Sequence, residues 1–266
     1  MKKVKVIVLR TAGTNCDYET EYAFQLANAD VELVHINQLI SRQKKLVDYK
    51  ILAIPGGFSY GDDIASGKIL ANEVRYRLLD SLEKFVGAGK LVIGICNGFQ
   101  VLVNMRLLPG FDDKIDKTQY STLSFNDSGK FEARWIYLKN TNKSKCPFVH
   151  YKTKVGMIYL PIAHGEGKFI TKNNKILEKI KNNDQIVFKY VMPNGKEGSY
   201  PWNPNGSNLA IAGICNARGN VLGMMPHPER FLTKYNHPHW TRGNLPEEGD
   251  GFAIFRNAVS YASDAL

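Results

Sequence analysis

Apolar residues in the first hundred positions follow two alternating patterns. Short runs rich in β-branched side chains predict buried strands. These runs lie at 4–9, 31–36, 49–54 and 91–95. Apolar side chains at helical spacing predict helices over 14–28 and 66–86, the second with Ser66 as its N-cap. Apolar strands that alternate with helices predict a parallel sheet with both faces covered.

The second half of the chain shows more strand-like segments and fewer helical ones. Strands are predicted at 131–138, 185–191, 209–215 and 221–225. A hairpin turn is predicted at 217–220, and an amphipathic helix at 251–261. We therefore expect one α/β domain over residues 1–266. It would be a three-layer sandwich with a mostly parallel central sheet and an antiparallel extension, and it would bind ligands at the carboxyl ends of its strands.

Composition narrows the class of protein. Hydrophobic residues make up 44% and charged residues 23% of the 266 positions, which is typical of a soluble globular protein and excludes a disordered or fibrous chain. The 35 basic and 25 acidic residues give a net charge of +10. This excess is compatible with an acidic partner, but no helix-turn-helix, RNP or zinc-finger pattern accompanies it, so no nucleic acid is expected.

Cysteine content and hydropathy indicate the compartment. The four cysteines form no C-x-x-C pair, and no apolar run approaches the roughly 20 residues that span a bilayer. We expect a reduced, cytoplasmic protein that does not enter a membrane.

A glycine-flanked cysteine follows the strand predicted at 91–95. Gly94 and Gly98 bracket Cys96, and a helical pattern begins directly afterwards. This is the form of a nucleophile elbow, in which a sharp strand-to-helix turn exposes the central side chain at a helix N-terminus. The positive end of the helix favours a thiolate there. The alternative is that Cys96 is a small buried apolar residue.

A histidine and a carboxylate follow the strand predicted at 221–225. Prolines at 226 and 228 keep the segment extended, so His227 and Glu229 face the same way. The imidazole could take the proton of a thiol, and the carboxylate could orient the imidazole. Without Cys96, a loop histidine beside a surface acid would be the simpler interpretation.

Backbone donors for an oxyanion could come from the turn that follows the third strand. Gly56 and Gly57 come directly after Pro55, at the same edge of the predicted sheet as Cys96. The N–H groups of this turn and of Asn97 could together bind a developing negative charge. The pair of glycines could equally be a tight turn with no further role.

Together these segments resemble the class I, triad-type glutamine amidotransferases. More narrowly, they resemble the glutaminase subunits of phosphoribosylformylglycinamidine synthase. The motifs that carry the narrower resemblance are Gly13-Thr-Asn-Cys-Asp17, Pro55-Gly-Gly-Phe-Ser-Tyr-Gly-Asp62, Gly94-Ile-Cys-Asn-Gly-Phe-Gln100, His164-Gly-Glu-Gly167 and Met225-Pro-His-Pro-Glu-Arg230. The resemblance spans nearly the whole chain and implies a flavodoxin-like sheet.

The resemblance also implies roles for single residues. Cys96 would attack the side-chain amide of glutamine to give a γ-glutamyl thioester and ammonia, with His227 as proton shuttle and Glu229 as its orienting partner. Substrate binding would fall to three further residues. Gly57 and Asn97 would supply oxyanion-hole amides, and Gln100 would help to hold the glutamine.

Partners follow from the same resemblance. Ammonia would pass to an ATP- and magnesium-dependent synthetase subunit that aminates formylglycinamide ribonucleotide, with a small bridging subunit between the two. The chain has no G-x-x-x-x-G-K-[ST] motif, so no cofactor is expected on it.

Several features keep other interpretations open. The segments 112–150 and 232–250 exceed what compact members of the family need, and their roles are not predicted. His164 and Glu166 could border the glutamine pocket or a partner interface, or form a simple turn. The His237-Pro-His239 spacing is too weak to predict a metal site, and Cys16 is expected to be structural. The main alternative function is another Cys-His-Glu hydrolase, such as a γ-glutamyl hydrolase.

Overall fold

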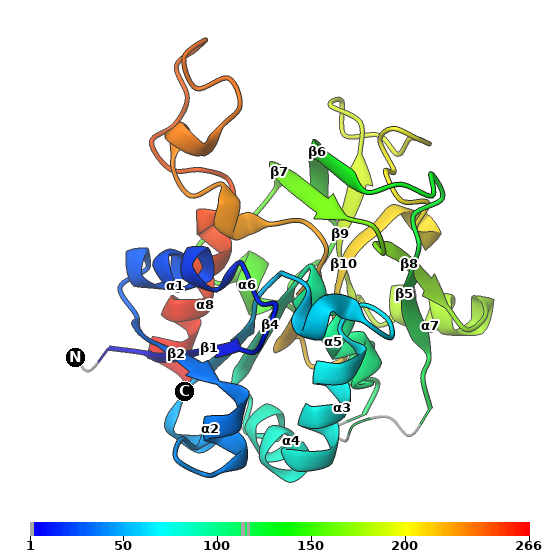
Figure 1. The fold of residues 1–266 in the computed structure, drawn as a ribbon. Helices are drawn as coiled ribbons and strands as arrows, with labels where there is room; N and C mark the ends of the chain where they lie inside the picture. Colours follow the sequence, from blue (N-terminus) through cyan, green and yellow to red (C-terminus); the bar gives the residue numbers. More distant parts are fainter. Residues whose placement is uncertain (1–2, 113–114, 116–117) are drawn as a thin grey trace.

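The computed structural model describes residues 3–112, 115 and 118–266. Its strands are Lys5–Arg10 (β1), Asp30–His35 (β2), Ile51–Ile54 (β3), Leu91–Ile95 (β4), Ser121–Ser124 (β5), Glu132–Asn140 (β6), Met157–His164 (β7), Lys168–Thr171 (β8), Ile186–Val191 (β9), Ile211–Cys215 (β10) and Val221–Met224 (β11). Nine of them form one sheet in the order β2-β1-β3-β4-β11-β10-β9-β6-β7, and β5 pairs with β8 (Figure 1).

The large sheet has a parallel half and an antiparallel half. Neighbouring strands are parallel from β2 to β11. They are antiparallel from β11 to β7. Strands β3, β4 and β11 are buried along their whole length, as expected where both faces of a sheet are covered. The predicted parallel sheet with an antiparallel extension is confirmed.

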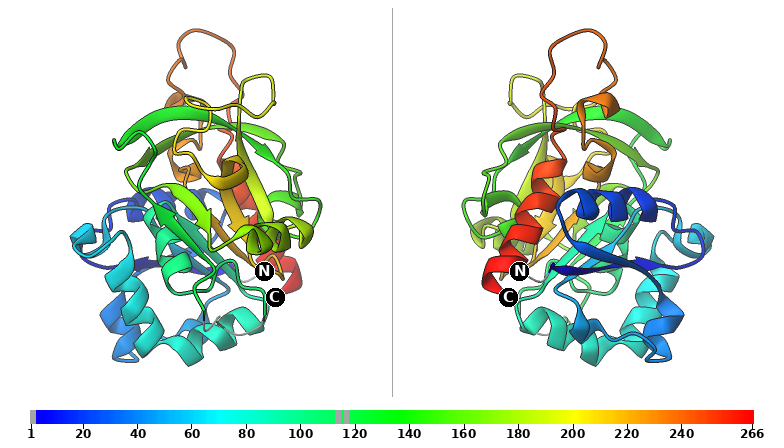
Figure 2. Two further views of the ribbon diagram at one scale, coloured as in Figure 1. Left: turned by 90° about the vertical axis from the view of Figure 1, so that its right-hand side faces the viewer. Right: turned by 90° about the vertical axis from the view of Figure 1, so that its left-hand side faces the viewer.

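Helices cover both faces of the parallel half. The helices are Asp17–Leu26 (α1), Ile36–Ile40 (α2), Lys68–Arg77 (α3), Leu79–Gly87 (α4), Asn97–Asn104 (α5), Pro147–His150 (α6), Asn174–Asn182 (α7) and Phe252–Ala265 (α8). On one face α1 packs on α8, where the rings of Phe24 and Phe255 meet edge to face at 5.0 Å. On the other face α3 packs on α5 (Figures 1 and 2). No helix in the described part of the chain is both long and apolar enough to cross a bilayer.

The segment 66–86 differs from the single helix predicted for it. Leu78 leaves the helical region at φ −127°, so α3 ends and α4 begins there. Apolar spacing continues across the break, which explains why the pattern did not reveal it. The predicted N-cap is also wrong. Gly67 precedes α3 in a left-handed conformation, while the hydroxyl of Ser66 donates to Asp62 Oδ2.

A long excursion lies between β11 and α8. Residues 232–250 extend away from the body of the molecule, as the orange segment of Figures 1 and 2 shows. A bridge between Thr233 and Glu248 closes its base, and the aromatic side chains of Tyr235 and Trp240 on it are exposed. In the other unassigned segment, 112–150, positions 113–114 and 116–117 lie outside the described residues, and the rest includes β5, β6 and α6.

The tight packing at the start of α5 leads to a prediction about the free energy of unfolding. A Cβ atom on Gly98 would lie 1.9 Å from the carbonyl oxygen of Ile54, whereas one on Gly87 at the end of α4 would meet no atom within 4 Å. Gly98→Ala is expected to lower the free energy of unfolding by about 3 kcal/mol or more, because backbone of β3 would have to move. Gly87→Ala should leave it within about 1 kcal/mol. Urea unfolding of both variants checks this, and equal effects would contradict the packing argument.

Candidate active site

Cys96 occupies the turn between β4 and α5. Its backbone adopts φ 50° and ψ −106°, a region that side chains disfavour. Both flanking glycines are required by contacts. A Cβ on Gly94 would lie 2.5 Å from the carbonyl oxygen of Gly98, and Gly98 lies against β3. The thiol is nearly buried and donates to the carbonyl oxygen of Ala163 at 3.6 Å. The predicted elbow is therefore present.

His227 and Glu229 lie beside this turn because β11 runs parallel to β4. Met224 pairs with Ile95, so the chain leaves both strands at the same edge of the sheet. The imidazole Nδ1 of His227 lies 2.6 Å from Glu229 Oε1, and both side chains are buried. A backbone hydrogen bond from His227 N to Pro161 O, 2.9 Å long, ties the segment to β7. The carboxylate thus holds the imidazole in one orientation.

Cys96 and His227 face one small cavity. Its volume is about 160 Å³, and it is lined by Asn15, Cys16, Gly57, Phe58, Cys96, Phe131, Ala163, His227 and Arg230. The ring of His227 and the Cβ of Cys96 both approach Gly56: a Cβ built there would lie 2.9 Å from the first and 3.5 Å from the second. Nε2 of His227 has no hydrogen-bond partner among the described residues. In enzymes without substrate, the hydrogen bond between a catalytic thiol and its histidine is often long, and it tightens when substrate binds.

Electrostatics favours a charged imidazole at this position. Burial opposes the imidazolium, but the Glu229 carboxylate and the Cys96 sulfur outweigh it, so the pKa of His227 is raised well above its ordinary value. An imidazolium beside the sulfur is the arrangement that stabilises a thiolate nucleophile.

The residues expected to bind the oxyanion lie at the same edge. Gly57 lines the cavity and adopts φ 140°, and a Cβ there would lie 2.7 Å from both Asn15 N and Gly13 O. Asn97 is the first residue of α5, where backbone N–H groups have no partner within the helix. Its side chain is held by Asp62, Gln100 and the amide of Ser59. Both backbone amides are therefore close to the Cys96 turn.

Gln100 does not line the cavity. Its amide nitrogen donates to the carbonyl oxygen of Glu166 at 2.7 Å, and its oxygen accepts from Asn97 Nδ2 at 3.0 Å. The side chain thus ties α5 to the loop that follows β7.

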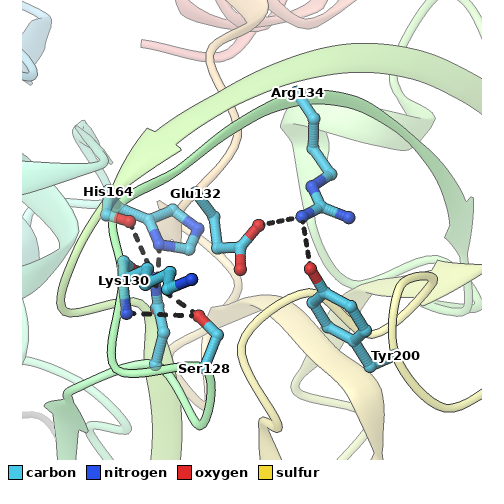
Figure 3. A network of polar contacts seen from close by, with 7 residues as sticks. Ser128, Lys130, Glu132, Arg134, His164 and Tyr200 are labelled. Carbon is cyan, nitrogen blue, oxygen red and sulfur yellow. Dashed lines mark hydrogen bonds and ion pairs between the residues drawn. The ribbon is translucent and has the colours of Figure 1, made fainter.

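His164 ends β7, one residue beyond the Ala163 carbonyl that accepts from Cys96. Its Nδ1 lies 3.1 Å from Asn126 Oδ1, while Asn126 Nδ2 donates to the carbonyl oxygens of His164 and Lys130. Figure 3 shows this cluster, with Glu132 between His164 and Arg134. Arg134 pairs with Glu132 and donates to Tyr200 at 2.9 Å. The cluster fixes the strand ends behind the cavity.

Buried His164 predicts a pH dependence of stability. Burial, with the nearby charge of His227, lowers the pKa of His164 to about 3 from an ordinary 6.5. Below its ordinary pKa the unfolded chain binds a proton that the folded chain refuses, so folding stability falls as the pH drops from about 6.5 towards 3. The contribution of this group is up to about 1.4 kcal/mol per pH unit. In His164→Gln the unfolding free energy, measured in urea at several pH values, should fall less steeply; an unchanged slope would contradict the assignment.

Two residues of the site were missed from the sequence. Cys16, expected to be structural, lines the cavity with its sulfur 4.0 Å from His227 Nδ1. Arg230 also lines it and donates to that sulfur at 3.0 Å. Their positions in the motifs Gly13–Asp17 and Met225–Arg230, each following a strand of the parallel half, were the available signal. His237 and His239 lie instead on the outward excursion, where their rings contact each other.

Comparison with known proteins decides the family. Residues 3–262 match the model of the CobB/CobQ-like glutamine amidotransferase domain. The chain belongs to the glutamine amidotransferases. Relatives of this glutamine amidotransferase include a protein of Dehalococcoides mccartyi named phosphoribosylformylglycinamidine synthase subunit PurQ, 46% identical over 98% of this chain and 99% of that protein. A protein of the same name from Archaeoglobus fulgidus is 44% identical over 98% of this chain and 97% of its own length.

Solved glutamine amidotransferase structures agree with the fold. A chain in the structure of PurLQS from Thermotoga maritima has 31% identity and a TM-score of 0.73, covering 97% of this chain and 99% of that one. A glutamine amidotransferase from the same organism shares 15% identity with a TM-score of 0.51, over 89% of this chain and 80% of that one, and supports the fold alone.

Proposed function

We propose that this glutamine amidotransferase is the glutaminase subunit of a phosphoribosylformylglycinamidine synthase, with Cys96, His227 and Glu229 as its catalytic triad. The observation that carries the proposal is the meeting of a strained cysteine and a buried histidine–carboxylate pair at one small cavity. At about 160 Å³ the cavity is smaller than the roughly 300–1,000 Å³ of pockets for drug-sized ligands, which suits a single amino acid. The names of the full-length relatives supply the pathway.

The chemistry follows from the geometry. The Cys96 thiolate attacks the side-chain carbonyl carbon of glutamine, and the amides of Gly57 and Asn97 bind the oxygen that becomes negative. The imidazolium of His227 donates its proton to the departing nitrogen, which leaves as ammonia, and a γ-glutamyl thioester remains. His227 then takes a proton from water, whose oxygen attacks the thioester. Glutamate leaves, the thiolate is regenerated, and Glu229 keeps the ring oriented in both halves.

Ammonia would be used by a partner. A synthetase subunit that holds ATP and magnesium would aminate formylglycinamide ribonucleotide to formylglycinamidine ribonucleotide, with a small bridging subunit completing the complex. The designation of the relatives as subunits and the assembly named PurLQS support this arrangement. A route shielded from water would keep the ammonia unprotonated. This matters because ammonium, the protonated form, is not a nucleophile.

Two further assignments belong to the proposal. Residues 1–266 form a single glutamine amidotransferase domain, which the family match over 3–262 supports. The protein acts in the cytoplasm, as an enzyme of purine biosynthesis would.

Glutamate release tests the function. The chain should hydrolyse glutamine, and addition of the synthetase with its nucleotide ligands should raise turnover strongly. Formylglycinamidine ribonucleotide should form from glutamine only when both subunits are present. Equal turnover of γ-glutamyl peptides, without stimulation by the synthetase, would instead identify a γ-glutamyl hydrolase.

Glu229→Ala measures the orienting role. Because orientation by the carboxylate is partly redundant, kcat should fall about a hundredfold less than in Cys96→Ala, as in other triads whose acid is removed. Steady-state glutamate release gives the values. A loss equal to that of Cys96→Ala would mean that Glu229 does more than orient the ring.

A further inference from the structure

Cys16 is a buried thiol at the active site that the proposed mechanism does not use. It precedes α1, at the carboxyl-end edge of the sheet, and is 1% exposed. Its sulfur lies on the Nδ1 side of His227, the side that Glu229 also occupies. Three different ligand types, a thiol, an imidazole and a carboxylate, therefore converge on one point.

The distances suit a small metal ion. One atom from each of Cys16, His227 and Glu229 lies within 4.8 Å of the other two. The sulfur is 4.0 Å from Nδ1, and Nδ1 is 2.6 Å from Oε1. In a tetrahedral zinc site, with bonds of about 2.3 Å to sulfur and about 2.0 Å to nitrogen or oxygen, neighbouring ligand atoms are roughly 3.3–3.6 Å apart. Shifts of roughly half an ångström would close the set around an ion.

Unsatisfied polar atoms point to the same conclusion. Glu229 Oε2 is buried and has no hydrogen-bond partner among the described residues. A buried carboxylate oxygen without a partner costs free energy, and a cation would satisfy it. Sulfur with imidazole selects Zn²⁺ and its neighbours over Mg²⁺ or Ca²⁺, which prefer oxygen ligands.

The cavity supplies access and a fourth ligand. Cys16 and His227 both line it, so an ion could enter from that side and complete its shell with a water molecule. Arg230 now donates to the Cys16 sulfur, but its side chain is about one-third exposed and lies 4.0 Å from Glu19, towards which it could turn.

We propose that Cys16, His227 and Glu229 form an inhibitory site for a soft divalent transition-metal ion, with Zn²⁺ as the best match. Coordination takes the Nδ1 lone pair of His227 and leaves the ring proton on Nε2. The ring then cannot accept a proton on the side of Cys96. Metal binding releases the thiol proton of Cys16 to solvent and, where His227 is an imidazolium, one proton of its ring. Because protons compete with the metal for these atoms, metal binding weakens as the pH falls. Metal binding itself does not rest on the proposed function; the inhibition does.

Cobalt spectroscopy on an inactive chain tests the site without relying on activity. In Cys96→Ala, one equivalent of Co²⁺ should produce thiolate-to-cobalt charge-transfer absorption that Zn²⁺ abolishes. The band should vanish in Cys96→Ala/Cys16→Ser. It should persist in Cys96→Ala/Cys215→Ala, the matched control, because Cys215 is buried in β10 and is not a cavity residue. No band in Cys96→Ala, or a band that survives loss of Cys16, would overturn the proposal.

Two further measurements follow. The first tests the metal site even if the double variant folds poorly, and the second tests the inhibition. Zn²⁺ should protect Cys16 of Cys96→Ala from alkylation, read by peptide mass spectrometry, and unchanged alkylation would count against the site. In Cys16→Ser the Zn²⁺ concentration for half-inhibition of the remaining glutaminase should rise roughly tenfold or more, with reversal by a chelator. If cobalt binds as described but zinc leaves glutamine hydrolysis unchanged, the metal site stands and its inhibitory role is overturned. Absence of glutamine hydrolysis before zinc is added would instead count against the proposed function.

Discussion

Cys96→Ala is expected to abolish glutamine hydrolysis, with kcat lower by roughly 10⁴-fold or more, because the thioester forms on the Cys96 sulfur. The fold should persist, since alanine removes only a nearly buried sulfur whose hydrogen bond to Ala163 is a long one of 3.6 Å. In complex with the synthetase, synthesis from added ammonium should continue while synthesis from glutamine stops. Glutamate release and product formation from each nitrogen source measure this.

A matched control separates the nucleophile from cysteine loss in general. Cys215→Ala also removes a fully buried thiol, but one in β10 and away from the cavity. It should keep full glutaminase activity per folded molecule. Glutamine turnover that survives Cys96→Ala would eliminate Cys96 as the nucleophile.

His227→Ala is expected to cost nearly as much as Cys96→Ala. The imidazole both stabilises the thiolate and carries the proton to the leaving nitrogen, so its removal should lower kcat roughly 10⁴-fold. Because the two groups act as a unit, the double variant should be no slower than either single variant. Glutamate release from all three proteins tests this, and losses that multiply in the double variant would contradict a shared role.

Thiol reactivity gives a second readout for His227. An adjacent imidazolium should keep Cys96 reactive towards iodoacetamide at neutral pH, and its loss in His227→Ala should slow the alkylation of Cys96 under the same conditions. Peptide mass spectrometry distinguishes Cys96 from Cys16. An unchanged alkylation rate would show that the imidazole does not interact with the sulfur in the free protein.

The parts of the site that local sequence determines were predictable. The turn at Cys96 depends on Gly94 and Gly98 within the same pentapeptide, and both are required by contacts with their immediate surroundings. His227 and Glu229 are two residues apart on an extended segment, so their pairing is also local. Their approach to Cys96 followed from one rule, that neighbouring parallel strands end at the same edge.

Features that depend on distant contacts were less predictable. Strand β7 was not expected, because Pro161 interrupts its pattern and its pairing with β6 is what defines it. The break at Leu78 leaves the apolar spacing intact. Cys16 belongs to the site only because the loop after β1 folds against the Gly56–Gly57 turn, where Asn15 and Cys16 both donate to Gly56 O. The spacing of apolar residues along the sequence does not predict that contact.

The left-handed backbone of Cys96 also limits how durable an active chain can be. Glycine could hold φ 50° without the steric conflict that a side chain meets there, and the relief should exceed the added freedom of the unfolded chain. Selection of variants for heat resistance alone would therefore favour Cys96→Gly, which would be more stable but inactive. Engineering this protein for thermal endurance needs selection for turnover at every round.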